Sequence, residues 1–245
     1  PADDDLLRPW SQAIVKMYEV APSDQTREDA KTAANEFAAY VEGLMRHRKD
    51  HPGEDLISQL AAVEDGGERL SAHELIATCV LLLNAGHEAS VNGLGNGMVA
   101  AMNHPEQMDL LRARPDEVSP TAIEEFLRFD SPLHLFERTA RADTEIGGVV
   151  VKEGQKIAAL IGSANRDESV FDHPERFDIT RDPNPHIGFG AGIHFCIGAP
   201  LARMEMSIAL PALMKRFPGI ELSGNPVSRG TFVLRGWASA PVTAS

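Results

Sequence analysis

The chain reads Phe189-Gly-Ala-Gly192-Ile-His194-Phe-Cys196-Ile-Gly198-Ala-Pro-Leu-Ala-Arg203 in its C-terminal half. One cysteine stands between two turns of small residues, directly before a strong helical pattern. Gly192 and Gly198 let the backbone turn tightly and approach a flat ligand without a Cβ in the way. A helix that begins near Ala199 points the positive end of its dipole at the sulfur, which favours the charged thiolate. The stretch therefore predicts a thiolate that binds a metal.

The spacing Phe-x-x-Gly-x-x-x-Cys-x-Gly, followed by Leu-Ala-Arg, resembles the haem-ligand loop of the cytochrome P-450 monooxygenases. This resemblance implies that Cys196 is the axial thiolate ligand of haem b, iron protoporphyrin IX. It also implies that Phe189 covers the sulfur and that Gly190, Gly192 and Gly198 lie against the haem. The alternative is a buried structural cysteine, because free cysteine often serves as a small apolar filler. That alternative does not explain the ordered glycines and phenylalanine around the sulfur.

Size and composition narrow the class of protein. With 245 residues, of which 43% are hydrophobic, the chain can bury a substantial core. No apolar run approaches the ~20 residues that cross a bilayer, and no signal peptide is visible. Two cysteines, Cys79 and Cys196, suit a reducing cytoplasm, with Cys79 in the core. The net charge of −13 argues against nucleic acid or an anionic membrane as partner. We expect a cytoplasmic protein.

Hydrophobic periodicity predicts a mainly helical chain with small β-sheets. A capping box, Ser71-Ala-His-Glu74, begins a helix of about thirty residues that ends at Met102. Ser119-Pro120 is expected to cap the helix that carries Glu124 to Arg128. The other expected helices are 26–49, 55–62, 105–112 and 199–217, and the expected strands are 149–151, 157–161 and a β unit at 232–234.

The segment from 170 to 198 is rich in Pro, Gly and Asp and lacks periodicity. Such a long irregular segment within a compact domain is usually functional. The resemblance implies a partial cytochrome P-450 fold, with residues 1–245 forming one haem domain that lacks the N-terminal part. The start at Pro1, without a methionine, suggests a fragment or a processed product. The chain would correspond to the C-terminal three-fifths of a full-length bacterial member.

Glu125 and Arg128 form an acid–base pair three residues apart on one helix face. An isolated pair of this kind is usually solvated and contributes a few tenths of a kcal/mol. The cytochrome P-450 family, however, carries Glu-x-x-Arg about seventy residues before its ligand cysteine. In that family an arginine of a Pro-Glu-Arg-Phe segment completes the pair, which implies Arg176 here. The implied role is structural, with a buried carboxylate between two guanidinium groups.

Haem carries two propionates, and their burial requires cations or hydrogen-bond donors. The resemblance implies that Arg138 and His194 bind these groups. For Arg138 the alternative is a surface charge at a strand edge. For His194 the alternative is a base that activates Cys196 as a nucleophile. Nothing in the sequence suggests the orienting partner and the oxyanion hole that such a nucleophile would need.

Ala85-Gly86-His87-Glu88-Ala89-Ser90 lies in the middle of the long predicted helix. In the family the corresponding stretch is Ala-Gly-x-acid-Thr, whose acid and alcohol deliver protons to dioxygen. Glu88 matches the acid, and Ala85 is implied to lie at the haem. Ala89 stands at the alcohol position, and Ser90 lies about 100° further around the helix. We therefore hypothesise that a substrate hydroxyl or an ordered water completes a relay from Glu88. The alternative for Glu88 is a satisfied structural carboxylate.

Substrate contacts follow only from the resemblance, which implies a pocket with mostly apolar walls and hence a lipophilic small molecule. Core packing is the alternative for each residue. The implied pocket residues are Leu82, Gly86, Leu133, Leu135, Phe136, Val233 and Leu234.

The resemblance implies a haem-thiolate monooxygenase of secondary metabolism that hydroxylates or epoxidises its substrate with O₂. Because no flavin or iron–sulfur motif is present, electrons are expected from a ferredoxin-type donor and its reductase. The rival is a haem-free or catalytically silent domain that binds a carrier or an enzyme, for which Ala89 and the late start argue. A third possibility is a family member that uses peroxide or catalyses dehydration or coupling.

Overall fold

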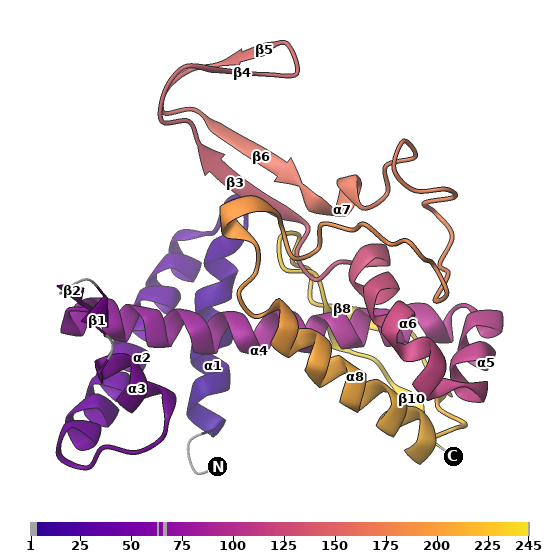
Figure 1. Ribbon diagram of the computed structural model, residues 1–245, viewed down its shortest axis with the longest axis horizontal. Coiled ribbons are helices and arrows are strands. Elements are labelled where there is room, and N and C mark those ends of the chain that lie inside the picture. Colours follow the sequence, from indigo (N-terminus) through magenta and orange to yellow (C-terminus); the bar gives the residue numbers. More distant parts are fainter. Residues whose placement is uncertain (1–3, 63, 66–67, 245) are drawn as a thin grey trace. The chain divides into compact units, whose positions relative to one another are not determined.

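The computed structural model describes residues 4–62, 64–65 and 68–244. The described chain forms two packed units, of which the first ends at Glu88 and the second begins at Ala89 (Figure 1). The observed elements are mainly helices with small antiparallel sheets, so the expected fold class is confirmed. The assignment of the whole chain to one haem domain stays a prediction.

The first unit consists of helices packed around a small core. Its buried apolar side chains are Phe37, Val41, Leu75 and Cys79, which confirms the expected place of Cys79. Burial raises the pKa of the Cys79 thiol, so this cysteine stays protonated and inert. The elements of this unit are α1 (Asp4–Val15), η1 (Lys16–Tyr18), α2 (Asp24–Asp50), α3 (Leu56–Ala62), β1 (Glu64–Asp65), β2 (Glu68–Arg69) and the first part of α4 (Ala72–Met102).

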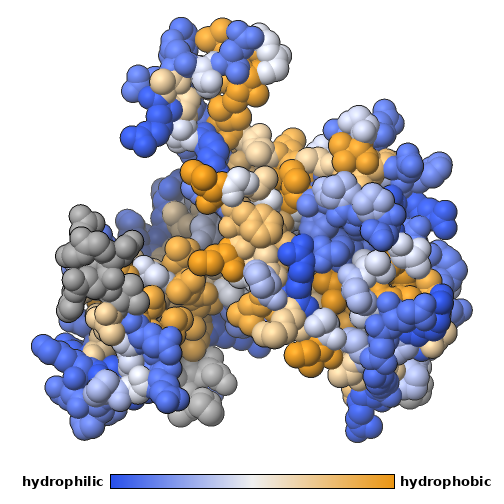
Figure 2. Space-filling view, in the orientation of Figure 1, coloured by the Kyte–Doolittle hydropathy of each residue, from blue (hydrophilic) through white to orange (hydrophobic). Residues whose placement is uncertain are grey.

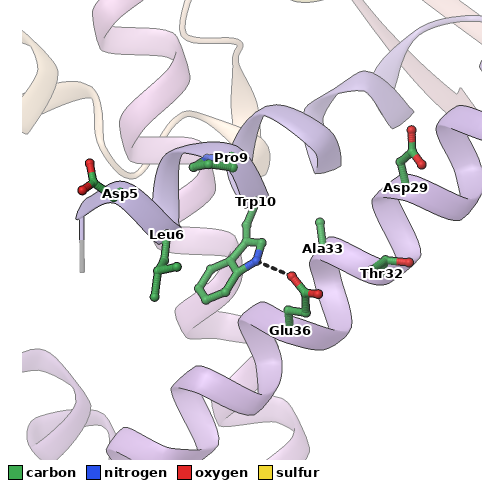
Figure 3. A pocket seen from close by; sticks show the side chains of 8 residues that line it. All are labelled: Asp5, Leu6, Pro9, Trp10, Asp29, Thr32, Ala33 and Glu36. Carbon is green, nitrogen blue, oxygen red and sulfur yellow. Dashed lines mark hydrogen bonds between the residues drawn. The ribbon is translucent and has the colours of Figure 1, made fainter. Parts of the chain in front are cut away.

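A surface groove lies between α1 and α2 (Figure 3). The Trp10 indole stacks on Phe37 with ring centroids 5.3 Å apart and donates its N–H to Glu36 Oε2 over 2.8 Å. The apolar body of Trp10 therefore packs on α2 while its polar tip is satisfied at the surface, as amphipathic aromatic side chains require.

Helix α4 begins with the predicted capping box. Ser71 N–H donates to Glu74 Oε2 over 2.8 Å, and Glu74 N–H donates to Ser71 Oγ over 3.3 Å. These two bonds satisfy amide groups that have no partner within the helix. The helix then runs without interruption to Met102, where Asn103 and His104 precede α5, as the sequence indicates.

The second unit has the larger core, formed mainly by α4, α6 and α8. Phe126 and Leu210 are fully buried at its centre. A Cβ on Gly97 of α4 would lie 1.9 Å from Phe126 Cδ2, so only glycine permits this approach of α4 to α6. The helices of this unit, besides the last part of α4, are α5 (Pro105–Ala113), α6 (Pro115–Phe129), α7 (Ile161–Ala164), η2 (Gly192–His194) and α8 (Ala199–Arg216).

Short antiparallel ladders complete the second unit. The longest pairs Leu135 with Leu160 and Thr139 with Lys156, and a hairpin extends beyond it (Figure 1). The hairpin exposes Val149 and Val150. The ladders pair β3 (Leu135–Thr139) with β6 (Lys156–Leu160), β4 (Thr144–Ile146) with β5 (Val149–Val151), β7 (Glu221–Leu222) with β10 (Val242–Thr243), and β8 (Val227–Ser228) with β9 (Trp237–Ser239).

Most expected elements differ from the observed bounds by one or two residues, and the largest difference is at the start of α6. Helix α6 begins at Pro115 and contains Pro120, so the cap predicted at Ser119-Pro120 is wrong. Pro115 occupies the first helical position, where a missing N–H has no cost, and the Ser119 hydroxyl donates to its carbonyl. The small β unit predicted to contain 232–234 is present: these residues lie between β8 and β9, and Leu234 adds a bridge to Leu133. Among the helices of the described chain, none combines the length and apolar composition that a bilayer crossing requires.

Candidate functional site

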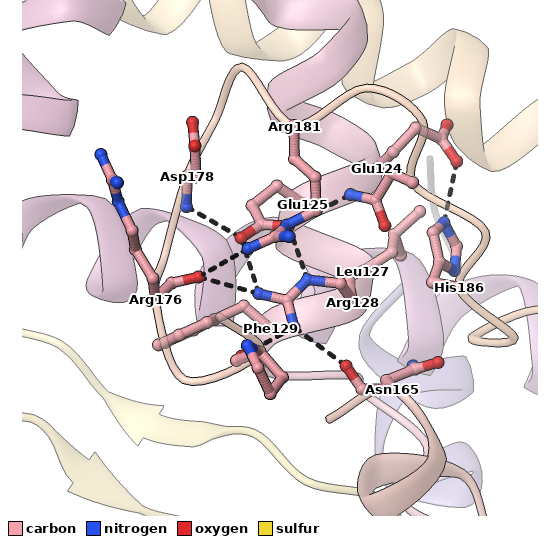
Figure 4. A network of polar contacts seen from close by, with 12 residues as sticks. Glu124, Glu125, Leu127, Arg128, Phe129, Asn165, Arg176, Asp178, Arg181 and His186 are labelled. Carbon is pink, nitrogen blue, oxygen red and sulfur yellow. Dashed lines mark hydrogen bonds and ion pairs between the residues drawn. The ribbon is translucent and has the colours of Figure 1, made fainter. Parts of the chain in front are cut away.

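The Glu125 network consists of Glu125, Arg128 and Arg181 (Figure 4). Arg128 donates from Nε to Glu125 Oε2 over 2.7 Å and from Nη2 to Oε1 over 2.8 Å, and both side chains are fully buried. The remaining Arg128 donors reach the carbonyls of Asn165, Pro174 and Arg176 over 2.9–3.0 Å. A single guanidinium thus satisfies the carboxylate and three carbonyls of the irregular segment, which no sheet or helix satisfies.

The second guanidinium of this network belongs to Arg181, so the prediction of Arg176 is wrong. Arg181 Nε lies 3.3 Å from Glu125 Oε2. The Arg176 side chain points away from Glu125, and its carbonyl accepts from Arg128 and Arg181 (Figure 4). The local backbone gives the reason: Phe177 and Ile179 are buried, and Arg181 N–H donates to Asp178 O over 3.1 Å. This turn returns the chain toward Glu125 at Arg181, five residues after the exposed Arg176.

The Glu125 carboxylate also receives donors from the segment that it orders. Asp178 N–H donates to Oε1 over 2.8 Å, and Asn184 Nδ2 donates to Oε2 over 3.1 Å. Burial would raise the pKa of Asp178, but bonds from the Thr180 hydroxyl and amide outweigh it and lower that pKa. The implied structural role of the Glu-x-x-Arg pair therefore has a clear geometric basis.

The loop around Cys196 is built from backbone turns. Gly190 has a φ of +73° and Gly192 a φ of +67°, a region that side chains disfavour. Cys196 N–H donates to Phe189 O over 2.9 Å, and Ala199 N–H at the start of α8 donates to Cys196 O over 3.2 Å. That second bond closes a turn at Ile197 and Gly198, as predicted, but Gly198 has a φ of −83° that other residues also adopt, so glycine is required only at Gly190 and Gly192. The cysteine thus precedes the helix N-terminus, as expected.

Apolar side chains around Cys196 are uncovered. The cysteine is exposed, and so are Ile193 at 97%, Ile197 at 87% and Phe195 at 50%. Figure 2 shows hydrophobic surface over the loop that precedes α8. Water around such side chains is unfavourable, and an apolar ligand would displace it. One accessible cysteine sulfur surrounded by apolar surface fits a haem bound through that sulfur, because the porphyrin supplies its own four nitrogen ligands.

The Glu124 cluster consists of Glu124, His186 and Arg203, and sequence reasoning missed it. Arg203 donates from Nε to Glu124 Oε1 over 2.6 Å and from Nη2 to Oε2 over 2.8 Å. His186 Nε2 lies 2.8 Å from Glu124 Oε2. The Arg203 guanidinium lies over the Phe189 ring, 4.6 Å from its centroid. The available signal was the second glutamate of Glu124-Glu125 together with the arginine of Leu-Ala-Arg.

In this cluster the negative charge of Glu124 is paired with the positive charge of Arg203. Burial alone would raise the pKa of Glu124, but hydrogen bonds from Arg203 and His186 lower it to about 2. The same bond with Glu124, and secondarily the charge of Cys196, raises the pKa of Arg203. Glu124 is therefore ionised at neutral pH, and the pair is an ionic contact between α6 and α8.

The implied proton-delivery residues lie along α4. Glu88 is 2% exposed, and His87 Nδ1 lies 3.7 Å from its Oε1. Ala89 and Ser90 follow on the same helix and are partly buried. Ala85 and Gly86 are exposed and Leu82 is partly buried, so these helix positions are open to a ligand.

The remaining implied residues belong to the second unit. Arg138 is exposed, donates to Glu137 O over 2.9 Å and lies over Phe136, 5.3 Å from the ring centroid. His194 is exposed in η2. The structure brings Leu133 beside Leu234 through their bridge, and His134 N–H donates to Val233 O over 2.9 Å. Leu135 and Val233 are buried, which is also the burial expected of core residues.

Comparison with known proteins identifies the family. The sequence profile of the family described as Cytochrome P450 matches residues 6–227. The polyketide biosynthesis cytochrome P450 PksS of Bacillus subtilis (strain 168) is 43% identical over 247 residues, covering 99% of this chain and 60% of that protein. The 6-deoxyerythronolide B hydroxylase of Saccharopolyspora erythraea is 40% identical over 237 residues, covering 95% of this chain and 57% of that protein.

Solved structures agree with the sequence matches. The crystal structure of P450BioI in complex with hexadec-9Z-enoic acid ligated acyl carrier protein has a TM-score of 0.94 at 37% identity, covering 100% of this chain and 63% of that chain. The cytochrome P450 PksS structure has a TM-score of 0.91 at 42% identity, covering 100% of this chain and 62% of that chain. The chain spans 55–60% of the length of the curated relatives that it matches first. This chain belongs to the cytochrome P450 family.

Proposed function

We propose that the protein is a haem-thiolate monooxygenase that inserts one atom of O₂ into a lipophilic small molecule. The observation that carries the proposal is the exposed Cys196, which directly precedes α8 in a loop ordered by glycine turns. Membership of the cytochrome P450 family supports it and does not favour a haem-free recruitment domain.

When bound, haem supplies the activation of O₂, and the residues of this chain bind and orient it. Cys196 would donate its thiolate to the iron, a ligand that favours O–O cleavage. Phe189 would exclude water from the sulfur. The exposed Arg138 and His194 would bind the propionates, since buried carboxylates require cations or donors.

Glu88 would move protons toward the oxygen site. Its burial suits this role, because a carboxyl shielded from bulk water exchanges protons only with groups that reach it. Ala89 has no hydroxyl, so a substrate hydroxyl or an ordered water would complete the relay. Ser90 lies about 100° away around the helix and does not occupy the place of the missing hydroxyl.

The substrate and the partners are proposed from the implied pocket residues and from the relatives of this chain. The bridge between Leu133 and Leu234, together with the buried Leu135 and Val233, supports an apolar pocket wall. The structural neighbour bound to an acylated carrier protein, and a relative named for polyketide biosynthesis, support a lipophilic substrate of secondary metabolism. We propose a ferredoxin-type electron donor and a cytoplasmic location.

Turnover under ¹⁸O₂ tests the activity. The haem-loaded protein, supplied with NADH, a ferredoxin, its reductase and a panel of fatty acids and macrolactones, should release products that carry one ¹⁸O atom. Products without label, or products formed only from peroxide, would contradict the monooxygenase assignment. Coupling of NADH consumption to product should fall in Glu88→Gln, and unchanged coupling would reject the relay.

A further inference from the structure

The hydrogen bonds of the Glu124 cluster indicate which ring nitrogen of His186 accepts and which one donates. Its Nδ1 accepts from Gly188 N–H over 3.1 Å, so that nitrogen carries no proton. Its Nε2 must then carry the proton and donate it to Glu124 Oε2 over 2.8 Å. The His186 side chain is 2% exposed. His186 therefore connects the Glu124 carboxylate to the Gly188 amide at the start of the cysteine loop.

Arg203, which lies on α8 after the loop, binds the same carboxylate. Its guanidinium binds Glu124 in a bidentate manner and lies 4.6 Å from the Phe189 ring centroid. Phe189 in turn accepts the Cys196 amide through its carbonyl over 2.9 Å, and its ring contacts Phe195 edge-on at 6.4 Å. Glu124 thus contacts one residue that precedes Cys196 in the sequence, His186, and one that follows it, Arg203.

The two neighbouring glutamates of α6 divide the irregular chain between them. Glu125 accepts from Asp178 and Asn184, which lie before the loop. Glu124 accepts from His186 and Arg203, which flank the loop. Because successive helix positions differ by about 100°, one buried and one partly exposed carboxylate serve different segments.

We propose that Glu124, His186 and Arg203 are positioning residues that set the geometry of Cys196 through the backbone of residues 186–198. The cluster is distinct from the Glu125 network and orders a different segment. The ordering of the loop belongs to the chain alone. Its consequence for haem ligation rests on the proposed function.

Two substitutions of His186 distinguish its bond to Glu124 from its bond to the Gly188 amide, which forms a local turn. His186→Gln keeps an N–H donor near the place of Nε2 and loses the acceptor for Gly188. His186→Asn keeps an acceptor near the place of Nδ1 and loses the donor to Glu124. Arg203→Lys keeps the charge and loses the bidentate contact and the stacking. Asp116→Asn is the matched control, because the exposed Lys215–Asp116 pair also joins α8 to α6 over 2.7 Å.

Amide hydrogen exchange of the purified chain gives the first measurement. His186→Asn and Arg203→Lys should speed exchange of residues 187–198 roughly tenfold, the effect of losing one charge-assisted hydrogen bond. Residues 165–184 should keep the parent rates, and Asp116→Asn should change neither segment by more than about twofold. Parent rates at 187–198 in both variants, or equal acceleration of both segments, would overturn the proposal.

The absorbance spectrum of the haem-loaded protein after reduction and addition of CO gives the second measurement. His186→Gln should keep the parent band, while His186→Asn should move part of it away from the thiolate position. The reverse order would show that only the turn at Gly188 matters and would overturn the proposal. A parent protein without haem absorbance that still shows the exchange pattern would reject the proposed function and leave the ordering role supported.

Discussion

Two irregular segments of the second unit, residues 165–184 and residues 190–198, differ in what surrounds them. In the first, fully buried Arg128 satisfies the carbonyls of Asn165, Pro174 and Arg176. In the second, Cys196, Ile193 and Ile197 are exposed. The difference teaches that irregular backbone can be ordered by one buried ion pair, while the neighbouring loop presents apolar surface for a ligand.

Substitution of Arg128, which orders residues 165–184, should cause the largest loss in the free energy of unfolding. Arg128→Ala leaves the Glu125 charge buried without its main partner and removes the Arg128 donor from the carbonyls of Asn165 and Pro174, while the Arg176 carbonyl keeps its bond from Arg181. We expect a loss of about 3–5 kcal/mol in the free energy of unfolding. Urea denaturation of the two proteins measures it, with Lys215→Met as the exposed control at about 0–1 kcal/mol. A cost of Arg128→Ala below that of the control would contradict the account.

The approach of α4 to α6 gives a second prediction, because α6 carries Glu125 and Arg128. Gly97→Ala would place a Cβ 1.9 Å from Phe126 Cδ2 and should cost about 1–3 kcal/mol through overpacking. At Gly95 a Cβ meets nothing within 4 Å, so Gly95→Ala should stabilise the helix by about 0.5–1 kcal/mol. Thermal unfolding of both variants should show shifts of opposite sign, and shifts of the same sign would reject this packing.

Acid unfolding tests whether the ionised Glu124 carboxylate, which contacts the residues that flank the cysteine loop, stabilises the fold. The folded pKa of Glu124, about 2, lies below the ordinary value of 4.5. Its contribution to stability is therefore complete above pH 4.5 and is lost as the pH falls toward 2. Glu124→Gln should cost about 1–2 kcal/mol at pH 7 and little at pH 2. Denaturation across this range measures the difference, and an equal cost at both ends would contradict the ionic contact.

Ile197 gives the smallest expected effect on folding. Its side chain is 87% exposed, so Ile197→Ser should change the free energy of unfolding of the haem-free protein by less than about 0.5 kcal/mol. If haem covers this surface, the same variant should transfer haem to apomyoglobin faster than the parent. Equal transfer rates would place Ile197 outside the ligand surface.

The sequence predicted the features that depend on local chemistry. The capping box at Ser71 and Glu74, the continuous helix to Met102 and the helix start at Ala199 follow from short-range rules, and the structure confirms them. The family was visible because the Cys196 spacing is rare without a ligand to explain it, and the comparisons confirm it.

Features that depend on long-range packing were not predictable. Arg181 rather than Arg176 pairs with Glu125 because the chain turns between Asp178 and Arg181 and returns toward that carboxylate. The contact of Glu124 with Arg203 joins residues 79 positions apart, and the short motifs that carry them do not show that they pair. Pro115 begins α6, five residues before the predicted cap at Ser119-Pro120.

Replacement of Cys196 tests the central claim most directly. The haem-loaded parent and Cys196→Ser should be compared by absorbance after reduction and addition of CO, with Cys79→Ser as the control because that thiol is buried in the first unit. Ligation through Cys196 predicts a band at the thiolate position in the parent and in Cys79→Ser, and its loss in Cys196→Ser. An identical band in Cys196→Ser would contradict ligation through this sulfur.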